Sequence, residues 1–330
     1  KIMSKEEYAN TLYPAAVKAL TISGEIYGVP LHYDGLLLLG NKKLLDADQV
    51  TVPKLWTDFR DAATKLTKTG PQTKKITQAG AAIGVSGNIP HAADIISLMF
   101  TQSRLRIPEN LDSQNAADSL TFYVDKFFKE DKVWDESLAP SILAFSRGQV
   151  AFIFAPSWRI LEIKENNPSL EILVSEPPQI VDEQEKVVAA NLASFWVEVV
   201  PKSSKFKNEA FDLLKFLTTS DSQKKIYALQ SSKRLFGEAP SRKDLASEYS
   251  SDPYLAPLLK TALTAEAAPT VDSSGNDAAV DVFSRAISDV VGGSDPKTAL
   301  ANAKKNLTSV LSGSTSLTTG GSGVSTPAKK

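Results

Sequence analysis

The sequence predicts an α/β fold made of two lobes. Segments typical of strands alternate with segments of helical periodicity along most of the chain, and this order is characteristic of α/β proteins. The chain has 330 residues, whereas a single core rarely extends beyond roughly 250 residues. Hydrophobic residues make up 42% of the chain and charged residues 23%, a composition that favours a globular protein.

The N-terminal half begins with a predicted helix over residues 4–20. Ser4 and Glu7 form a capping box there, and apolar residues follow at helical spacing as far as Leu20. Four consecutive leucines at residues 36–39 predict a buried strand. The same rules predict helices over residues 55–69, 92–100 and 122–128, and strands over residues 26–30, 81–85, 149–154 and 170–174.

The C-terminal half continues the alternation. Residues 187–200 form a long extended stretch that Pro201 ends, and Asp295 with Pro296 opens a final helix. Residues 312–330 contain 13 Ser, Thr or Gly residues among 19, which leaves too few apolar groups to fold, so we expect a disordered tail. Further helices are predicted over residues 206–218, 221–230, 241–249 and 280–290.

The charge balance and the scarcity of Cys and His exclude several kinds of site. Lys and Arg number 37 and Asp and Glu 38, so no basic surface for nucleic acid is predicted. The absence of Cys removes disulfides, thiolate metal sites and a cysteine nucleophile. With only His32 and His91, we expect no metal site built on two or more imidazoles. We therefore predict no metal, no cofactor and no nucleic-acid partner.

Signatures of common enzymes are also missing. The sequence contains no Walker loop, no glycine-rich dinucleotide fingerprint and no His-Glu-x-x-His motif. A serine hydrolase elbow needs a Gly-x-Ser-x-Gly spacing that residues 84–87 lack. We therefore predict no catalytic residue and no enzyme. Glycoside hydrolysis needs only two carboxylates about 5 to 10 Å apart, so a glycoside-active enzyme stays open as an alternative.

A series of short motifs resembles one family. Residues 24–30, Gly-Glu-Ile-Tyr-Gly-Val-Pro, precede a hydrophobic strand and Asn41-Lys42-Lys43-Leu44-Leu45. Together with later motifs in the same order, this passage is similar to extracellular solute-binding proteins of the maltose-binding type, the substrate-binding components of ABC sugar importers. The later motifs lie at residues 56–59, 145–152, 156–158, 210–217, 239–242 and 295–300.

The resemblance implies the fold of periplasmic binding proteins, with two α/β lobes, a hinge and a cleft between the lobes. The chain would cross between the lobes near residues 30–35, 190–201 and 265–272. The family usually has several strand–helix units before the Tyr-Gly-Val-Pro passage, so we expect an incomplete first lobe and an N-terminally truncated chain. The implied N-terminal lobe comprises residues 1–30 with 200–266, and the C-terminal lobe comprises residues 36–190 with 270–311.

The resemblance also implies a function and a location. Ligand binding would close the hinge and shift the equilibrium between the open and closed forms towards the closed form. A permease would recognise the closed form. The transport ATPase would be another chain. We expect a monomer that captures a small solute, most often a carbohydrate, in the periplasm or lipid-anchored at the outer face of the cell membrane. A binding or sensing module without a transport partner is a further alternative.

Candidates for ligand binding lie near the expected crossings and at positions where members of the resembled family approach the ligand. Asp34 follows the passage proline, where a carboxylate can accept hydrogen bonds from sugar hydroxyls. Trp158 stands at the family position of an aromatic platform for a sugar face. The full predicted set is Tyr33, Asp34, Asn88, His91, Trp158, Asn191, Ser194 and Trp196.

Each candidate has a structural alternative. Asp34 can be an acid of the hinge turn, Trp158 can pack in the core, and His91 can be a cap or surface residue. Because side chains alternate along a strand, only one of Phe195 and Trp196 can face the cleft. Some sugar binders have an aromatic residue near the start of the helix after residue 276, where this chain has Asn276, Asp277 and Asp281. This difference argues against stacking of an oligosaccharide and leaves a smaller or more polar solute open. We assign Trp56 to structure and expect Trp134 to be a structural or a surface residue.

Overall fold

The computed structural model describes residues 3–181, 186–268 and 278–311. The expected tail and part of the third expected crossing lie outside these residues. A mixed sheet forms the centre of the fold, and the predicted α/β class is confirmed. Its strands are β3 (Val29–Asn41), β4 (Lys68–Thr69), β5 (Ile76–Ala81), β6 (Val150–Pro156), β7 (Ile172–Ser175), β10 (Asn191–Glu198), β11 (Ala239–Pro240) and β12 (Ala265–Ala267).

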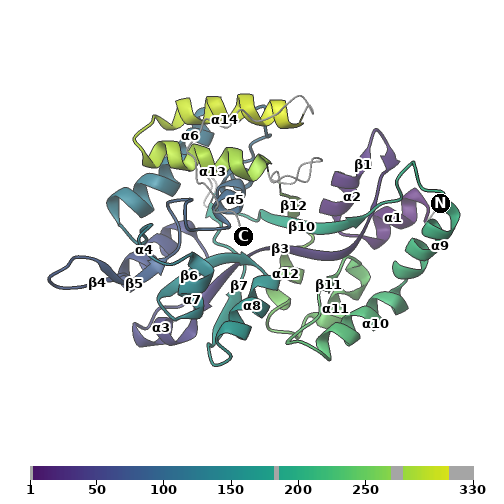
Figure 1. Ribbon diagram of the computed structural model, residues 1–330, viewed down its shortest axis with the longest axis horizontal. Helices are drawn as coiled ribbons and strands as arrows, with labels where there is room; N and C mark the ends of the chain where they lie inside the picture. Colours follow the sequence, from purple (N-terminus) through teal and green to yellow (C-terminus); the bar gives the residue numbers. More distant parts are fainter. Residues whose placement is uncertain (1–2, 182–185, 269–277, 312–330) are drawn as a thin grey trace, which may run out of the picture.

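The long strand β3 connects the two parts of the molecule. The sheet order is β12-β10-β3-β6-β5-β4, with β7 and β11 also paired to β3. The first half of β3 pairs with β10 and β11, and the second half pairs with β6 and β7. Figure 1 shows β3 and β10 running from the larger part of the molecule on the left to the smaller part on the right.

β3 changes its partners between Gly35 and Leu36. Gly35 is opposite Ala193 of β10, and Leu36 is opposite Pro156 of β6. A Cβ atom at Gly35 would lie 2.4 Å from the backbone oxygen of Leu192. Glycine is therefore required here, because β10 approaches β3 too closely for any side chain.

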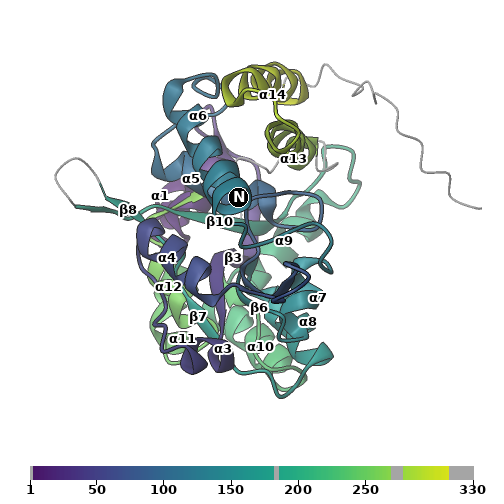
Figure 2. The same cartoon turned by 90° about the vertical axis from the view of Figure 1, so that its left-hand side faces the viewer.

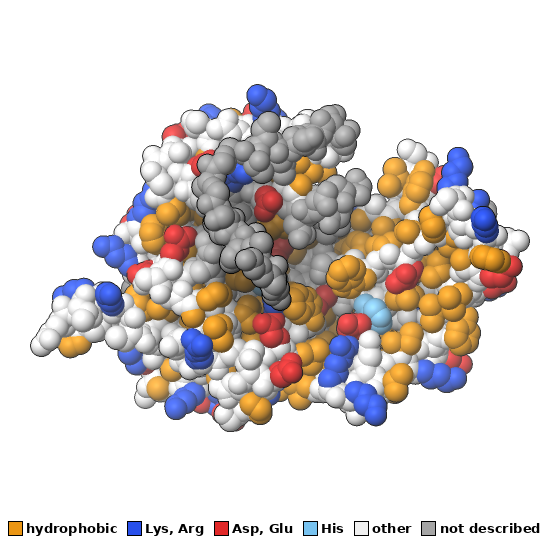
Figure 3. Space-filling model, viewed as in Figure 1, with side chains coloured by type: hydrophobic (Ala, Val, Ile, Leu, Met, Phe, Trp, Pro, Cys, Tyr) orange, Lys and Arg blue, Asp and Glu red, His pale blue; other side chains and the backbone are white. Residues whose placement is uncertain are grey.

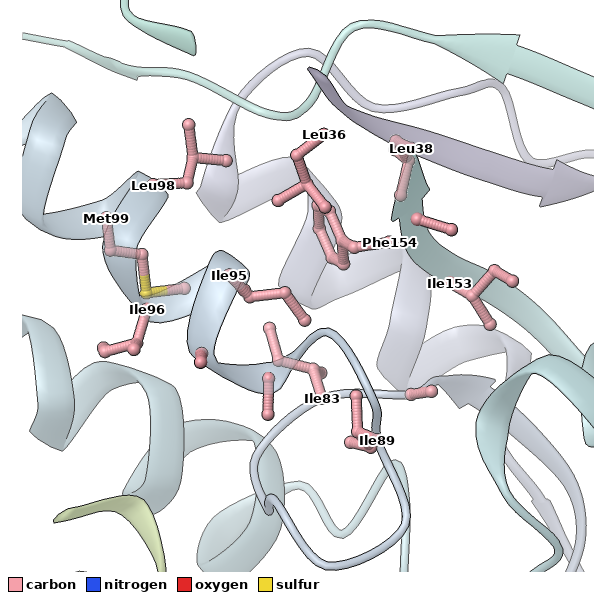
Figure 4. Packing of buried hydrophobic residues seen from close by; sticks show 14 of the residues in the cluster. Leu36, Leu38, Ile83, Ile89, Ile95, Ile96, Leu98, Met99, Ile153 and Phe154 are labelled. Carbon is pink, nitrogen blue, oxygen red and sulfur yellow. The ribbon is translucent and has the colours of Figure 1, made fainter. Parts of the chain in front are cut away.

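The larger part is built on the buried second half of β3. The four leucines at residues 36–39 are all buried, as predicted. Figure 4 shows Leu36 and Leu38 beside Phe154 of β6 and facing apolar side chains of α5. The surrounding helices are α3 (Lys42–Ala47), α4 (Trp56–Leu66), α5 (Ala92–Gln102), α6 (Gln114–Thr121), the π-helix η1 (Phe122–Glu130), α7 (Ser141–Ser146), α8 (Trp158–Asn166), α13 (Ala278–Val291) and α14 (Pro296–Leu311).

Two C-terminal helices close one end of this part. Figure 2 shows α13 and α14 at that end, with α6 close to α14. Asp295 begins α14 as predicted, because its carboxylate accepts a hydrogen bond from the backbone N–H of Thr298 at 2.9 Å. β8 (Ile180–Val181) pairs antiparallel with β9 (Val187–Val188) in a separate two-stranded sheet.

The smaller part contains the N-terminal helices. Ser4 accepts a hydrogen bond from the backbone N–H of Glu7 at 3.0 Å, which confirms the predicted cap. The single helix expected over residues 4–20 is wrong, because Pro14 cannot donate to the preceding turn and starts a second helix. The elements here are α1 (Lys5–Thr11), α2 (Pro14–Leu20), β1 (Thr21–Ile22), β2 (Glu25–Ile26), α9 (Lys207–Leu217), α10 (Ser220–Ser231), the 3₁₀ helix η2 (Lys243–Leu245), α11 (Ala246–Tyr249) and α12 (Ala256–Thr261).

Two further expectations need correction. The strand expected at residues 81–85 lies earlier, as β5, because Gly84 has a φ of 100° that is incompatible with an extended strand. The helix expected over residues 241–249 is a 3₁₀ turn followed by the short α11. Within the described residues, no helix has the length and apolar character needed to cross a membrane.

Candidate functional site

Asp34 joins β3 to the start of α8. Its carboxylate accepts hydrogen bonds from the backbone N–H and the hydroxyl of Ser157, both at 2.9 Å, and from the backbone N–H of Gly35 at 2.7 Å. The backbone N–H of Trp158 is a fourth donor, at 3.4 Å. Burial raises the pKa of Asp34, and these hydrogen bonds oppose that shift. Asp34 therefore acts as a cap of α8 and fixes the position of Trp158.

Trp158 offers an aromatic surface at the start of α8. Its side chain is 43% exposed. The guanidinium carbon of Arg159 lies 4.1 Å from the centre of the indole ring, which is the geometry of a cation–π contact. The His91 ring stands edge-on to the indole, with 6.4 Å between ring centres. One side of the indole is thus supported by the protein while a large part stays open to solvent.

A hydrogen-bond chain holds Arg159 against the indole. Arg159 Nε donates to His91 Nε2 at 3.2 Å, and His91 Nδ1 lies 2.9 Å from a carboxylate oxygen of Asp94. Because Nε2 accepts, the geometry assigns the hydrogen of the neutral ring to Nδ1, which donates to Asp94. Arg159 also pairs with Glu162 of the same helix. The chain fixes both the His91 tautomer and the direction of the guanidinium.

A small pocket lies beside this cluster, where β3 changes its partners. Its volume is about 80 Å³. Asp94 of α5, Pro156 of β6 and Ser194 of β10 contribute to its wall. Ser194 is opposite Asp34 in the pairing of β3 with β10. The pocket therefore collects groups from four elements that are distant in sequence, with Gly35, Leu36, Leu192, Ala193 and Ala268 as the remaining lining.

Four of the predicted residues gather at this point and four do not. Ser194 lines the pocket, and Asp34, His91 and Trp158 belong to the cluster beside it. Tyr33 is only 2% exposed and packs against Tyr13, with 4.6 Å between ring centres. Trp196 is 79% exposed and lies farther along β10, opposite His32.

Asn88 and Asn191 have their polar groups engaged within the protein. The Asn88 side chain accepts from Trp134 Nε1 at 2.7 Å and donates to two backbone oxygens. Asn191 is 3% exposed, and its side-chain oxygen accepts from Gln179 at 3.1 Å. In this conformation the side chains of Asn88 and Asn191 serve contacts within the protein, as Tyr33 does. We leave Tyr33, Asn88 and Asn191 out of the candidate site. Trp134 is buried.

Asp94, Ser157 and Arg159 belong to the cluster but were not predicted. Asp94 follows His91 by three residues, a spacing that brings side chains together on a helix, so the sequence contained a usable signal. Ser157 and Arg159 flank Trp158, but neighbouring positions on a helix point in different directions, and their contacts depend on β3 and α5. The described residues contain no group of three or more His, Asp or Glu side chains arranged to hold a metal ion.

Solved structures of similar fold are solute-binding proteins. One is an ABC transporter solute-binding protein from Thermotoga lettingae bound with α-D-tagatose, which is 22% identical, with a TM-score of 0.71 over 93% of this chain and 79% of its own. A maltotriose-binding protein from Thermus thermophilus is 19% identical, with a TM-score of 0.67 over 92% of this chain and 77% of its own. A cyclic α-maltosyl-1,6-maltose binding protein from Arthrobacter globiformis is 17% identical, with a TM-score of 0.72 over 94% and 78%.

The sequence itself matches one protein family. The model of the bacterial extracellular solute-binding proteins covers residues 2–257, well over half of the chain. This match agrees with the two-part fold around β3 and with the resemblance seen in the short motifs. The family description places its members outside the cytoplasm and assigns them the binding of solutes. The chain belongs to the family of bacterial extracellular solute-binding proteins.

Proposed function

We propose that this protein captures a carbohydrate outside the cytoplasm and delivers it to the permease of an ABC importer. The observation that carries the proposal is the exposed indole of Trp158, held beside hydrogen-bonding groups where β3 changes its partners. A sugar ring presents an apolar face of C–H groups and a rim of hydroxyls. An open aromatic surface next to polar groups complements both features.

The polar rim would come from His91, Asp94, Arg159 and Ser194. Asp34 would act mainly by holding α8 in place, because its oxygens already accept four hydrogen bonds. The structures of similar fold support a sugar as the solute class, since those proteins bind tagatose, maltotriose and a cyclic maltose derivative. The tagatose-bound protein is an ABC transporter solute-binding protein, and this supports a permease as the proposed partner.

The proposed motion uses the two strands that run between the parts of the molecule. The lobes would be residues 1–30 with 200–266 and residues 36–190 with 270–311, and β3 and β10 would bend where they pass between them. A solute that contacts both lobes would stabilise the closed form by its differential affinity. We further propose that the protein acts as a monomer and carries no catalytic activity.

Thermal unfolding with a panel of solutes tests this function. We expect tagatose, maltotriose or mannobiose to raise the melting temperature, while free amino acids and a tripeptide leave it unchanged, because selective binding stabilises the native state. Trp158→Ala should abolish most of the shift. Phe216→Ala, which removes an exposed aromatic residue of α9, is the matched control and should preserve the shift.

Two results would contradict the proposal. A shift with an amino acid or peptide and none with any sugar would assign another solute class. Chromatographic detection of sugar hydrolysis by the purified protein would support the glycoside-active alternative.

A further inference from the structure

A second, larger pocket lies away from Trp158 and shares none of the lining of the candidate solute site. Its volume is about 590 Å³, which falls within the range of roughly 300–1,000 Å³ typical of small-molecule sites. Its wall comes from α2 and the segment around β12 on one side, and from the end of α5 and the segment before β10 on the other. It is therefore a recess between elements that are far apart in sequence.

In the part of the chain that the structure describes, four cationic side chains line this recess. Lys18 lies on α2, Arg104 and Arg106 follow α5, and Lys186 precedes β9. Among the described residues of the lining, one side chain is acidic, that of Glu266, which pairs with Lys18 at 3.7 Å. Both partners of that pair are largely exposed, so the contact itself is weak, and the carboxylate offsets one of the positive charges. The chain as a whole has a formal net charge of -1, and the excess of cations is therefore a local feature of the recess.

The two arginines are not used in ion pairs. Within residues 3–181, 186–268 and 278–311, neither the Arg104 nor the Arg106 guanidinium forms a salt bridge, and both side chains are exposed. Thr101 and Thr264 lie in the same lining, and each hydroxyl donates its hydrogen to a backbone oxygen, Thr101 to Ser97 and Thr264 to Thr261. Guanidinium groups bind carboxylate and phosphate oxygens in paired geometry, and a recess lined by one sign of charge concentrates ions of the opposite sign.

We propose that this recess is a second binding site that takes a small anionic molecule, with phosphate or carboxylate oxygens held by Arg104 and Arg106. Lys18 adds charge at the rim, and the threonine hydroxyl oxygens can accept hydrogen bonds from hydroxyl groups of the ligand. The volume accommodates a phosphorylated monosaccharide or a sugar acid of one or two rings. The site does not depend on which solute occupies the cleft at Trp158.

The backbone conformation at Arg104 allows a substitution that removes the side chain without disturbing the fold. Arg104 has a φ of 55°, in the left-handed region that glycine prefers. Its backbone N–H donates to Thr101 and the N–H of Leu105 donates to Phe100, which together form the Schellman end of α5. Arg104→Gly keeps this backbone conformation and removes the guanidinium, so loss of binding cannot be ascribed to loss of fold.

Isothermal titration at low ionic strength would measure the proposed binding. The probes are glucose 6-phosphate, digalacturonate and inorganic phosphate, with glucose as the neutral control. We expect at least one organic anion to bind with an affinity that falls as salt is added, while glucose gives no heat at this site. Binding of glucose 6-phosphate alone identifies a phosphate ligand, and binding of digalacturonate alone identifies a carboxylate ligand.

The variants decide whether the recess is the site. Arg104→Gly combined with Arg106→Gln should weaken binding of the organic anion at least tenfold and leave the melting temperature within the error of the wild type. Arg147→Gln, which removes one exposed arginine outside the recess, should bind like the wild type. Equal binding by the double variant and the wild type, or no binding of any anion at low salt, would overturn the proposal.

Discussion

Trp158 owes its orientation to residues that are remote in the sequence. Asp34 fixes the backbone at the start of α8, and His91 fixes the guanidinium that lies on the indole. A single aromatic side chain on a surface has many rotamers, and ordering it costs entropy. These contacts order the Trp158 side chain in the folded protein before a solute arrives. Binding then loses less conformational entropy, because the site is preorganised.

Asp34→Ala should destabilise the fold. The change removes the acceptor of four hydrogen bonds and leaves buried donors of Ser157 without a partner. We expect the free energy of unfolding to fall by about 1–3 kcal/mol, measured by urea denaturation. Asp61→Ala, at an exposed position of α4, is the control and should change stability little. An unaltered stability in Asp34→Ala would mean that Asp34 does not cap α8.

His32 should make the protein sensitive to mild acid. Burial lowers the pKa of His32 below its ordinary value of 6.5; Arg234 adds to this shift, while Glu238 and Glu198 oppose it. In the unfolded chain the ring takes up a proton near pH 6.5, whereas in the fold it does so only at lower pH. The stability contributed by neutral His32 is therefore present above pH 6.5 and lost as the pH falls through the folded-state pKa.

Chemical denaturation between pH 7.5 and 5 would measure this dependence. His32→Asn should flatten the decline in stability towards acid. Glu238→Gln should steepen it, because the Glu238 carboxylate, 3.3 Å from the ring, favours the charged form. A slope that neither variant changes would assign the acid sensitivity to another group.

At the scale of elements, one glycine determines how two strands meet. Gly35→Ala would place a methyl group 2.4 Å from the Leu192 oxygen, so β10 would have to move away from β3. We expect a loss of about 1–3 kcal/mol in the free energy of unfolding, the usual cost of overpacking. Gly292→Ala is the control, since the added methyl group there meets only ordinary contacts of 3.4 Å. Equal stability of the two variants would show that β10 adapts freely.

Elements with strong periodicity were predicted well, and those shaped by a single residue were not. The helices α4, α5 and α13 follow the apolar spacing of their sequences because one face of each is buried in the core. The break between α1 and α2 and the early end of β5 depend on Pro14 and Gly84. Pro14 and Gly84 do not interrupt the apolar pattern, so a prediction based on periodicity does not detect their effect.

At the scale of the whole molecule, the smaller part exposes an apolar surface. Only Leu214 of α9 is buried, whereas Phe211, Leu213 and Phe216 are exposed. Figure 3 shows hydrophobic side chains gathered on this part of the molecule, on the right. A surface of this kind promotes association in solution.

Replacing the exposed apolar residues of α9 should improve solution behaviour without loss of fold. We expect Leu213→Lys with Phe216→Lys to lower the fluorescence of bound anilinonaphthalene sulfonate and to leave the melting temperature nearly unchanged. Leu214→Lys, which buries a charge, should lower the melting temperature strongly. A large loss of stability in the double variant would indicate that both side chains pack in solution.

The sequence by itself determined the class of fold, the family and the position of the buried strand at residues 36–39. These properties depend on periodicity, caps and short motifs, which are local in the chain. Only the tertiary structure decided which polar groups share the site. Asp34 meets Ser157 across 123 positions, and Arg159 meets His91 across 68. Contacts of this kind depend on how β3, α5 and α8 pack, and packing is a property of the folded chain that no local pattern encodes.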